Sequence, residues 1–264
     1  MKTPLLSFLF FLVIFGACIS DRQPASAVDY SLLVNPFIGT DFTGNTYPGA
    51  QAPFGMVQLS PDNGLPGWDR ISGYYYPDST IAGFSHTHLS GTGAGDLYDI
   101  SYMPVTLPYR EAEAPLGIHS KFRHSDEEAS AGYYRVLLKD YNINVELTAT
   151  ERCGIQRYTF PKAQSAVFLN LKKAMNWDFT QDSHIEVVDS CTIQGYRFSD
   201  GWARGQRVFF RTRFSKPFRS SEIDTTAIIQ DGKTIGTAYV ARFNFDTTDG
   251  EEIVLCTALS GVSM

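Results

Sequence analysis

With 264 residues, of which 43% are hydrophobic and 14% aromatic, the chain can bury a sizeable core in one large β domain or two smaller ones, and this composition excludes a disordered protein. A formal net charge of −6 gives no electrostatic footprint for a polyanion, so nucleic-acid binding is excluded as well. The nearest approach to a basic patch is a set of arginines that alternate with aromatic residues, which indicates one solvated sheet face: Arg204, Arg207, Arg211 and Arg213.

The amino terminus has the features of an export signal. Lys2 supplies positive charge, Leu5 to Phe15 is almost wholly apolar, and the small residues Gly16 and Ala17 precede Cys18. The apolar run is too short to span a bilayer. Small residues directly before a cysteine resemble the bacterial lipoprotein signal, in which Cys18 is lipidated and begins the mature protein; ordinary secretion with cleavage nearby is the alternative. We expect an exported protein, in the periplasm or at the cell surface, with a lipid anchor at Cys18.

A short polar segment separates this signal from the folded part of the chain. We expect residues 1–17 to form the signal peptide and residues 18–29, which are mainly small and polar, to form a flexible tether. The folded domain is expected to span residues 30–264.

Beyond the tether, the apolar residues cluster in short β-branched and aromatic runs, and no helical period is sustained. Asp231-Gly232 and Asp249-Gly250 lie between such runs, where Asp-Gly supplies the positive φ that tight hairpin turns require. Many strands with short turns and no intervening helices predict an all-β fold, a large antiparallel β-sandwich, rather than a parallel α/β fold. The predicted strands cover residues 132–139, 143–151, 155–160, 166–171, 193–198, 208–214, 235–245 and 253–259.

The first third of the domain, residues 35–99, is dense in Gly, Pro, Tyr, Asp and His and has fewer clean strands. Long irregular segments in compact proteins are usually functional loops, so we expect any binding site there. His86 and His88 would share one side of a strand, a spacing that metal sites use, but no third ligand has a diagnostic spacing. Hydrogen bonding to a substrate is therefore favoured over metal ligation, with structural histidines as the alternative.

Two further clusters flank these histidines. Trp68-Asp69 suits a sugar ligand, because aromatic rings stack on the C–H faces of sugars and carboxylates bind their hydroxyl pairs; a core tryptophan is the alternative. Gly91, Gly93 and Gly95 allow a close backbone approach to a ligand or a tight bend, and their spacing does not fit a nucleotide-binding loop. Neither cluster contains a nucleophile motif, so no catalytic residue and no metal ligand is assigned to this chain.

The cysteines leave the disulfide pattern open. Without Cys18 there remain Cys153, Cys191 and Cys256, so at most one internal disulfide forms, and the pair cannot be read from spacing. Buried free thiols are an equally good interpretation.

Six short motifs follow one another in the first third of the domain. They are VNPFIGT (34–40), NTYPGA (45–50), PFGM (53–56), LSPD (59–62), SGY (72–74) and GFSHTHLSG (83–91). Together they resemble the start of glycoside hydrolase family 92, a family of exo-acting α-mannosidases. ALSGVS (258–263) is similar to the close of that family's first domain.

The resemblance implies a galactose-mutarotase-like supersandwich followed by a helical barrel that carries the catalytic acid, the catalytic base and a calcium ion. This chain covers only the first part, so the barrel is missing and the chain alone is expected to be inactive. It implies the amino-terminal domain of an exported, calcium-dependent, inverting α-mannosidase that acts on mannose-containing glycans. A stand-alone carbohydrate-binding module and a structural docking domain are the alternatives.

The resemblance also implies that loops of this domain border the substrate pocket. Two positions depart from the family pattern: Tyr75 stands where many members have His, and Tyr98 where Gly is common, so the linkage or leaving-sugar preference is expected to differ. Six residues match the patterned loops and are expected to line or support the pocket: Trp68, Asp69, His86, His88, Ser90 and Asp96.

Overall fold

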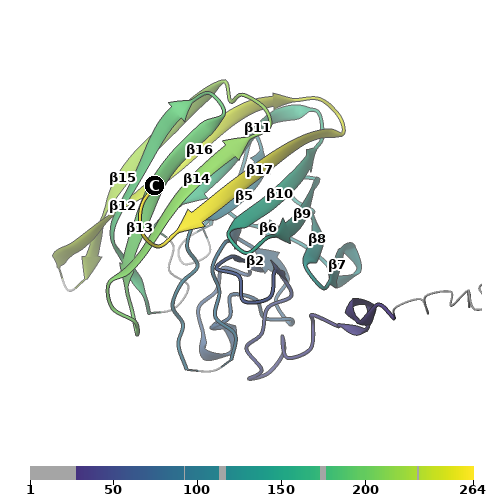
Figure 1. Ribbon diagram of the computed structural model, residues 1–264. Helices are drawn as coiled ribbons and strands as arrows, with labels where there is room; N and C mark the ends of the chain where they lie inside the picture. The colour runs from purple at the N-terminus through teal and green to yellow at the C-terminus, as the bar shows by residue number, and fades with distance from the viewer. Residues whose placement is uncertain (1–27, 92, 113–116, 173–176, 231) are drawn as a thin grey trace, which may run out of the picture.

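The computed structural model describes residues 28–91, 93–112, 117–172, 177–230 and 232–264 (Figure 1). These residues form 17 β-strands and three short 3₁₀ helices, without an α-helix among them. The predicted all-β class is therefore confirmed. None of the helices in this part of the chain is long and apolar enough to cross a membrane. The predicted signal peptide, Cys18 and most of the tether lie outside the described residues, and they remain predictions.

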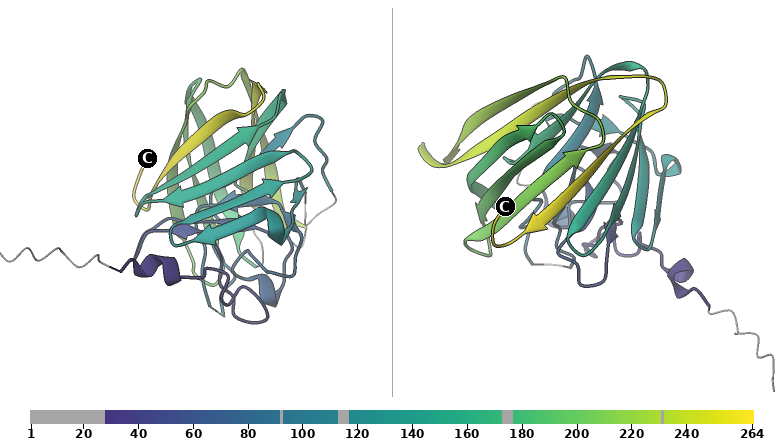
Figure 2. Two further views of the ribbon diagram at one scale, coloured as in Figure 1. Left: turned by 90° about the vertical axis from the view of Figure 1, so that its right-hand side faces the viewer. Right: turned by 45° about the horizontal axis from the view of Figure 1, so that its top comes forward.

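The strands form two large antiparallel sheets that face each other as a sandwich (Figures 1 and 2). The seven-stranded sheet has the order β1 (Ala50–Gln51), β2 (Gln58–Asp62), β4 (Gly83–Ser85), β5 (Ser101–Thr106), β11 (Ala163–Asn170), β16 (Lys233–Thr247), β15 (Ser220–Gln230). The eight-stranded sheet has the order β12 (Phe179–Asp189), β13 (Thr192–Asp200), β14 (Gln206–Phe214), β17 (Glu251–Ser260), β10 (Cys153–Phe160), β9 (Ile143–Ala149), β8 (Tyr133–Leu138), β7 (Glu127–Ser130). The small elements are the paired β3 (Thr80–Ile81) and β6 (Ser120–Lys121), and the 3₁₀ helices η1 (Tyr30–Leu33), η2 (Trp68–Arg70) and η3 (His124–Asp126).

Each predicted strand corresponds to an observed one, with ends that differ by a few residues. Two long strands, β12 and β15, were not predicted. Both are edge strands, and they bury few side chains, so they carry no clear apolar alternation. The predicted turn at Gly250 has φ of +72° and joins β16 to β17, as an Asp-Gly hairpin turn requires.

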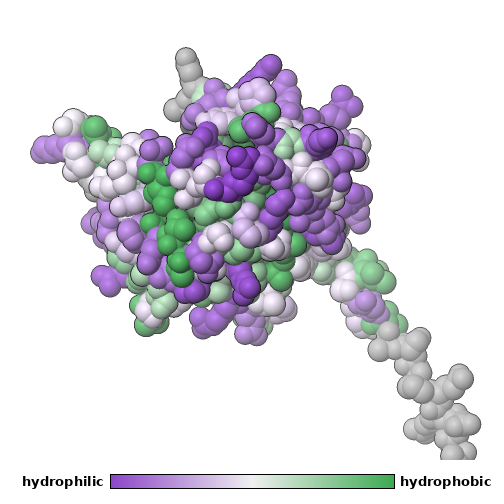
Figure 3. Space-filling view, turned by 90° about the horizontal axis from the view of Figure 1, so that it is seen from above, coloured by the Kyte–Doolittle hydropathy of each residue, from purple (hydrophilic) through white to green (hydrophobic). Residues whose placement is uncertain are grey.

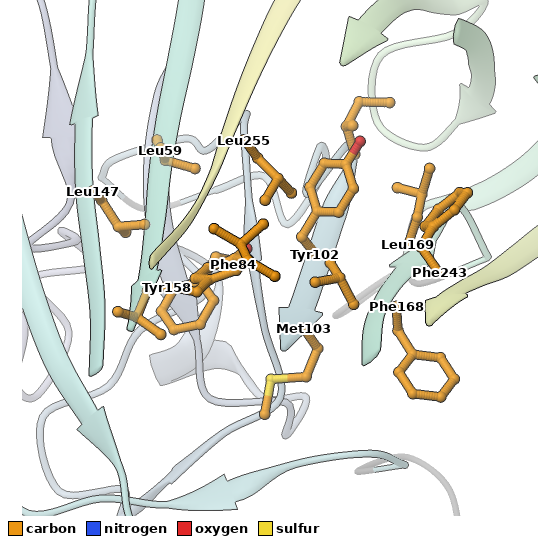
Figure 4. Close-up of a cluster of buried hydrophobic side chains, with 14 of the residues drawn as sticks. Leu59, Phe84, Tyr102, Met103, Leu147, Tyr158, Phe168, Leu169, Phe243 and Leu255 are labelled. Atoms are coloured by element: carbon orange, nitrogen blue, oxygen red, sulfur yellow. The ribbon is translucent and has the colours of Figure 1, made fainter. Parts of the chain in front are cut away.

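The core fills the space between the two sheets. In β10, Gln156, Tyr158 and Phe160 are buried while Arg157 between them is exposed, as the period of two in a strand dictates. Tyr102 of β5 reaches across the sandwich, and its hydroxyl lies 2.6 Å from the hydroxyl of Thr212 on β14. Figure 4 shows the neighbouring side chains that pack around Tyr102 and Tyr158.

The loops of the first third gather at one end of the sandwich, the lower end in Figure 1. η1 projects from the body near this end, as Figure 3 also shows from above. Its residues Tyr30, Leu32 and Leu33 are all exposed. Over the rest of the face seen in Figure 3 the surface is mostly hydrophilic, with a band of hydrophobic side chains. The sandwich therefore acts as a scaffold for one loop-rich end.

Candidate functional site

Trp68 is presented to solvent on the short helix η2. Its side chain is 55% exposed, and its ring stacks on that of Trp177, with centroids 6.2 Å apart and an interplanar angle of 26°. The helix is held by Arg70, whose guanidinium donates two hydrogen bonds of 2.6 Å to the carboxylate of Asp78. Asp69 between them is half-buried. Because each of the two stacked indoles is about half exposed, part of its apolar surface stays open to a ligand, and such a surface suits a sugar face.

His86 is fully buried just after β4. Its Nδ1 lies 2.7 Å from the carbonyl oxygen of Ile100, so the neutral ring donates from Nδ1. Its Nε2 packs toward Gly154 and has no hydrogen-bond partner in the described part of the chain. Desolvation lowers the pKa of His86 to about 4, so the ring is neutral near pH 7. This environment matches the structural interpretation of the histidine pair.

His88 is also buried, and its ring is fixed on both nitrogens. Nδ1 lies 2.7 Å from the carbonyl oxygen of Gln58, and Nε2 lies 2.9 Å from Oδ1 of Asp62 and 3.1 Å from Oγ of Ser85. The ring of Tyr47 packs beside it, with centroids 5.1 Å apart. His88 therefore ties β2 to the loop that follows β4 and supports the loops from within.

Asp96 holds the hairpin between β13 and β14. Its carboxylate is 1% exposed and accepts hydrogen bonds from the backbone N–H groups of Trp202, at 3.0 Å, and Ala203, at 2.8 Å. Nε2 of Gln206 donates a third, at 3.2 Å. Asp96 and Ser90 line a cavity of about 350 Å³, and Trp202 forms part of its wall with 76% of its own surface exposed. Two of the six predicted residues thus meet at one hollow.

A buried ion-pair cluster stands behind this hollow. Nη1 of Arg197 donates to Oδ1 of Asp99 at 2.6 Å and to the carbonyl oxygen of Leu97 at 3.3 Å, and Nη2 donates to Oδ2 of Asp178 at 2.8 Å. Burial alone would lower the pKa of the Arg197 guanidinium, but the two carboxylates outweigh burial and raise it. The cluster joins residues 97–99 to β13 and to Asp178, which directly precedes β12.

Asp178 is the member of this cluster whose carboxylate is only partly satisfied by hydrogen bonds. Its Oδ1 is buried without a hydrogen-bond partner among the described residues. Desolvation raises the pKa of Asp178 to about 6, although the nearby guanidinium of Arg197 opposes the change. A Cβ added at Gly201 would lie 2.4 Å from Oδ1 of Asp96 and 2.9 Å from Cβ of Asp178, so the carboxyl group of Asp96 and the Cβ of Asp178 flank the same glycine.

These contacts bring three tryptophans to one end of the sandwich. Trp177 stacks on Trp68 and adjoins Asp178, while Trp202 adjoins Gly201, which packs against Asp178. The chain has three tryptophans, and they are 55%, 44% and 76% exposed, although Trp is usually well buried. Trp68 and Asp69 do not line the hollow beside Asp96, and His86 and His88 lie beneath the surface.

Sequence reasoning missed Trp177, Trp202 and Arg197. A signal existed for Arg197, because it shares the inward phase of β13 with Ile193 and Gly195, where a charge needs buried partners. Nothing in the sequence indicated that Trp177 and Trp202 would be exposed.

The two departures from the family pattern lie close to this end. Tyr98 has φ of +64°, a backbone conformation that glycine adopts without strain, so a glycine would fit this position. The hydroxyl of Tyr98 donates to the carbonyl oxygen of Ile71, just after η2. The ring of Tyr75 lies under the guanidinium of Arg70, 4.6 Å from centroid to Cζ. Both tyrosines therefore support η2.

The described residues contain no group of three or more His, Cys, Asp or Glu side chains that would hold a metal ion. The calcium ion that the family resemblance implies therefore has no fitting set of ligands in this part of the chain, and no step is derived through it.

The architecture places the chain among the large antiparallel β-sandwich proteins. Residues 33–260 match the glycosyl hydrolase family 92 N-terminal domain, and the chain belongs to this family. The resemblance seen in the short motifs is thereby confirmed.

Solved relatives extend the match in three dimensions. A family GH92 α-mannosidase from Bacteroides thetaiotaomicron, solved alone and with mannoimidazole, is 35% identical, with a TM-score of 0.79 over 89% of this chain and 33% of that chain. A family GH92 inverting mannosidase from the same organism is 26% identical, with a TM-score of 0.72 over 90% of this chain and 32% of that chain. An uncharacterized secreted glycosidase from Arthroderma benhamiae is 28% identical over 138 residues, 48% of this chain and 17% of the relative. The chain spans about a third of the length of the solved relatives, which contain a further part beyond it.

Proposed function

We propose that this chain is the amino-terminal domain of an exported α-mannosidase and that its loop end forms one wall of the substrate cleft. The observation that carries the proposal is the exposure of Trp68, Trp177 and Trp202 on one loop-rich end of a domain that matches a third of an α-mannosidase. Exposed aromatic rings on rigid supports suit the C–H faces of a mannose-containing glycan.

In this proposal the more exposed residues contact the sugar, and the buried residues support the loops. Trp68 and Asp69 on η2 contact the sugar, Trp68 by stacking and Asp69 by hydrogen bonding to hydroxyl groups. Ser90 lies exposed at the hollow beside Asp96 and offers a further hydroxyl contact. His86, His88 and Asp96 are buried, so in this proposal they hold the contacting loops in place.

Catalysis in this proposal belongs to the remaining part of the enzyme. Inverting glycosidases use a carboxylic acid that protonates the leaving oxygen and a separate carboxylate that activates water. The most perturbed carboxyl group at the loop end, Asp178, is buried against Arg197 and does not face the surface, so it is assigned to support and not to catalysis. A helical catalytic domain with its calcium ion is the proposed partner.

The proposed location is outside the cytoplasm, because the sequence before the domain has the features of an export signal and one relative is named a secreted glycosidase. Lipidation at Cys18 is part of this proposal. Intact-mass measurement of the mature protein tests it: a diacyl or triacyl mass on Cys18 is expected, and an unmodified amino terminus contradicts it.

A chimera tests the assignment of the pocket. Residues 30–264 of this chain replace the matching third of the 35% identical B. thetaiotaomicron α-mannosidase, and release of mannose from an α-mannoside is measured with calcium present. The chimera is expected to be active, and Trp68→Ala and Asp69→Asn are each expected to lower kcat/KM about tenfold or more. Ile229→Ala, an exposed residue on β15, is the control and should leave kcat/KM unchanged.

The outcomes separate the parts of the proposal. If the isolated chain released mannose, catalysis would not belong to the missing part. If the chimera were active but Trp68→Ala and Asp69→Asn matched the control, these two residues would not line the cleft.

A stand-alone carbohydrate-binding role is the second candidate, favoured by the stacked and exposed pair of Trp68 and Trp177. Isothermal titration of the isolated chain with mannose oligosaccharides distinguishes the two. Clear affinity that is lost in Trp177→Ala supports a binding module, whereas the main proposal expects weak or no binding before the second wall is present.

A further inference from the structure

Two cysteines lie side by side on the outer face of the eight-stranded sheet. Cys153 begins β10 and Cys256 lies within β17, 103 positions later, and their sulfur atoms are 3.2 Å apart. Cys153 is half-buried and Cys256 is exposed. Cys191, the third thiol among the described residues, lies at the turn between β12 and β13.

The register of the sheet explains the approach of the two sulfurs. Cys153 pairs with Ala258, and Cys256 pairs with Ile155, so the two cysteines are diagonal neighbours two positions apart. Side chains two positions apart along a strand share one face, which brings both thiols to the same side of the sheet.

A bond between them requires a small movement. A disulfide has an S–S distance of about 2.05 Å, so the sulfurs must approach by about 1.2 Å, the difference between 3.2 and 2.05 Å. Cys153 is placed to make this movement, because β10 pairs with β9 only from Gly154 onward. On that side Cys153 is held only by the turn to Thr150, whose Oγ1 accepts its N–H at 3.2 Å.

We propose that Cys153 and Cys256 are a thiol-oxidation site that closes to an intramolecular disulfide when the chain meets a small-molecule or protein disulfide as oxidant. Proteins outside the cytoplasm commonly encounter such oxidants. This inference rests on the proposed location outside the cytoplasm but not on the sugar-binding proposal, because it concerns two thiols on the outer face of the eight-stranded sheet and none of the proposed sugar contacts.

The exchange is balanced by the oxidant. The exposed sulfur of Cys256, as thiolate, attacks one sulfur of the oxidant's disulfide; the S–S bond breaks, one thiol leaves, and a mixed disulfide forms on Cys256. The sulfur of Cys153 then attacks the sulfur of Cys256, and the second thiol leaves. The two protein thiols lose two electrons and two protons, and the oxidant's disulfide is reduced to two thiols.

The surroundings of Cys153 set the order of these steps. Burial, and then the neighbouring thiol of Cys256, raise the pKa of Cys153 to about 11, so Cys153 stays protonated near pH 7. Cys256 is the exposed thiol of the two, so the oxidant reaches it first. Once Cys256 carries the mixed disulfide, its charge no longer opposes ionisation of Cys153, and the second attack becomes easier.

Mass spectrometry of an oxidised variant tests the proposal. The full chain with Cys18→Ser and Cys191→Ser keeps only Cys153 and Cys256 and is treated with oxidised glutathione, then with a thiol-blocking reagent. The expected product has lost the mass of two hydrogens and carries neither glutathione nor a blocking group. Tryptic digestion should yield two peptides joined by a disulfide between Cys153 and Cys256. A stable glutathione adduct as the end product, or two blocked thiols after full exposure, overturns the proposal.

A matched variant identifies the attacking sulfur. With Cys153→Ser added, the intermediate on Cys256 has no partner to resolve it, so one glutathione per chain is expected to accumulate. With Cys256→Ser added in its place, the half-buried Cys153 is expected to react at least tenfold more slowly. Equal reaction rates of the two single thiols would overturn the proposed order.

Discussion

The carboxylate of Asp96 accepts the backbone N–H of Trp202, a residue 106 positions later, at 3.0 Å. A buried carboxylate in an early loop thus fixes a hairpin of the eight-stranded sheet that carries an exposed indole. The neighbouring bond from the N–H of Ala203 fixes the same turn at a second point. At the loop end, therefore, buried polar side chains form hydrogen bonds that fix the backbone carrying the exposed aromatic side chains.

Removal of the Asp96 carboxylate is expected to loosen that hairpin. Asp96→Ala leaves two backbone N–H groups without their acceptor, and we expect the free energy of unfolding to fall by about 2 kcal/mol. Asp96→Asn keeps one acceptor oxygen and should lose about half as much. Urea unfolding gives both values, and hydrogen exchange at the amides of Trp202 and Ala203 should become faster.

Asp246→Asn is the control for this prediction. Asp246 is an exposed partner of Arg219, so its loss should change stability by less than about 0.5 kcal/mol. If Asp96→Ala were as stable as this control, with amide exchange unchanged, the hairpin would not depend on Asp96.

The fold was predictable because most strands bury one face. In β10 the buried Tyr158 and Phe160 alternate with the exposed Arg157 and the half-buried Thr159, and such alternation is readable in one sequence. The edge strands β12 and β15 were not predicted, because a strand that pairs with one neighbour and buries few side chains needs no apolar face.

The candidate site was predictable only as a region. The Gly- and His-rich loops do gather at one end, but the bonds that organise that end join distant residues, as between Asp99 and Arg197, 98 positions apart. A pairing of that kind leaves no local pattern. The spacing of His86 and His88 was equally compatible with surface or interior positions, and only burial distinguishes the two.

Arg197 is expected to be essential for the stability of the loop end. Arg197→Met removes the cation between the buried carboxylates of Asp99 and Asp178, and we expect the free energy of unfolding to fall by about 3 to 5 kcal/mol. Arg197→Lys should recover only a part, because one ammonium group cannot reproduce the planar fork that bonds both carboxylates.

A triple variant checks that reason. Adding Asp99→Asn and Asp178→Asn to Arg197→Met removes the uncompensated charges, so part of the lost stability should return in urea unfolding. If the triple variant were less stable than Arg197→Met alone, buried charge would not be the cause of the loss.

Asp178 is expected to make stability fall as the pH rises through the mildly acidic range. Its pKa is raised from 3.8 to about 6, so the native state binds the proton more tightly than the unfolded chain does. The stability that this proton contributes is fully present below pH 3.8 and is lost as the pH rises through 6. The difference amounts to about 3 kcal/mol, from about 1.36 kcal/mol per pH unit.

The difference in stability between the wild type and Asp178→Asn isolates this contribution. Measured by urea unfolding from pH 3 to pH 8, the stability of the wild type relative to Asp178→Asn should fall by about 3 kcal/mol as the pH rises. A difference that is the same at every pH would show that Asp178 titrates alike in both states.

His86 is expected to make stability fall as the pH is lowered, the opposite dependence to that of Asp178. Its pKa is lowered from 6.5 to about 4, so the unfolded chain binds the proton more tightly, and stability is lost as the pH falls from 6.5 toward 4. The expected loss is about 3 kcal/mol. His86→Asn, whose amide N–H can replace Nδ1–H toward Ile100, should lack this loss; a wild type and variant with parallel pH profiles would contradict it.

Gly201 should tolerate no side chain, because the carboxyl group of Asp96 and the Cβ of Asp178 both pack against it. In Gly201→Ala the new Cβ would lie 2.4 Å from Oδ1 of Asp96 and 2.9 Å from Cβ of Asp178, so at least one of these side chains has to move. We expect a loss of about 2 to 3 kcal/mol in the free energy of unfolding, together with faster exchange of the Trp202 amide.

Gly205→Ala is the matched control in the same hairpin. Its Cβ would meet nothing within 4 Å, so the substitution should cost only the backbone strain of a side chain at φ of +65°, about 1 kcal/mol. Because an added Cβ meets Asp96 and Asp178 at position 201 and meets nothing at position 205, the exchange of the Trp202 amide should rise in Gly201→Ala and not in Gly205→Ala. Equal effects of the two substitutions would mean that the hairpin responds to backbone strain alone and that Asp96 and Asp178 do not position it.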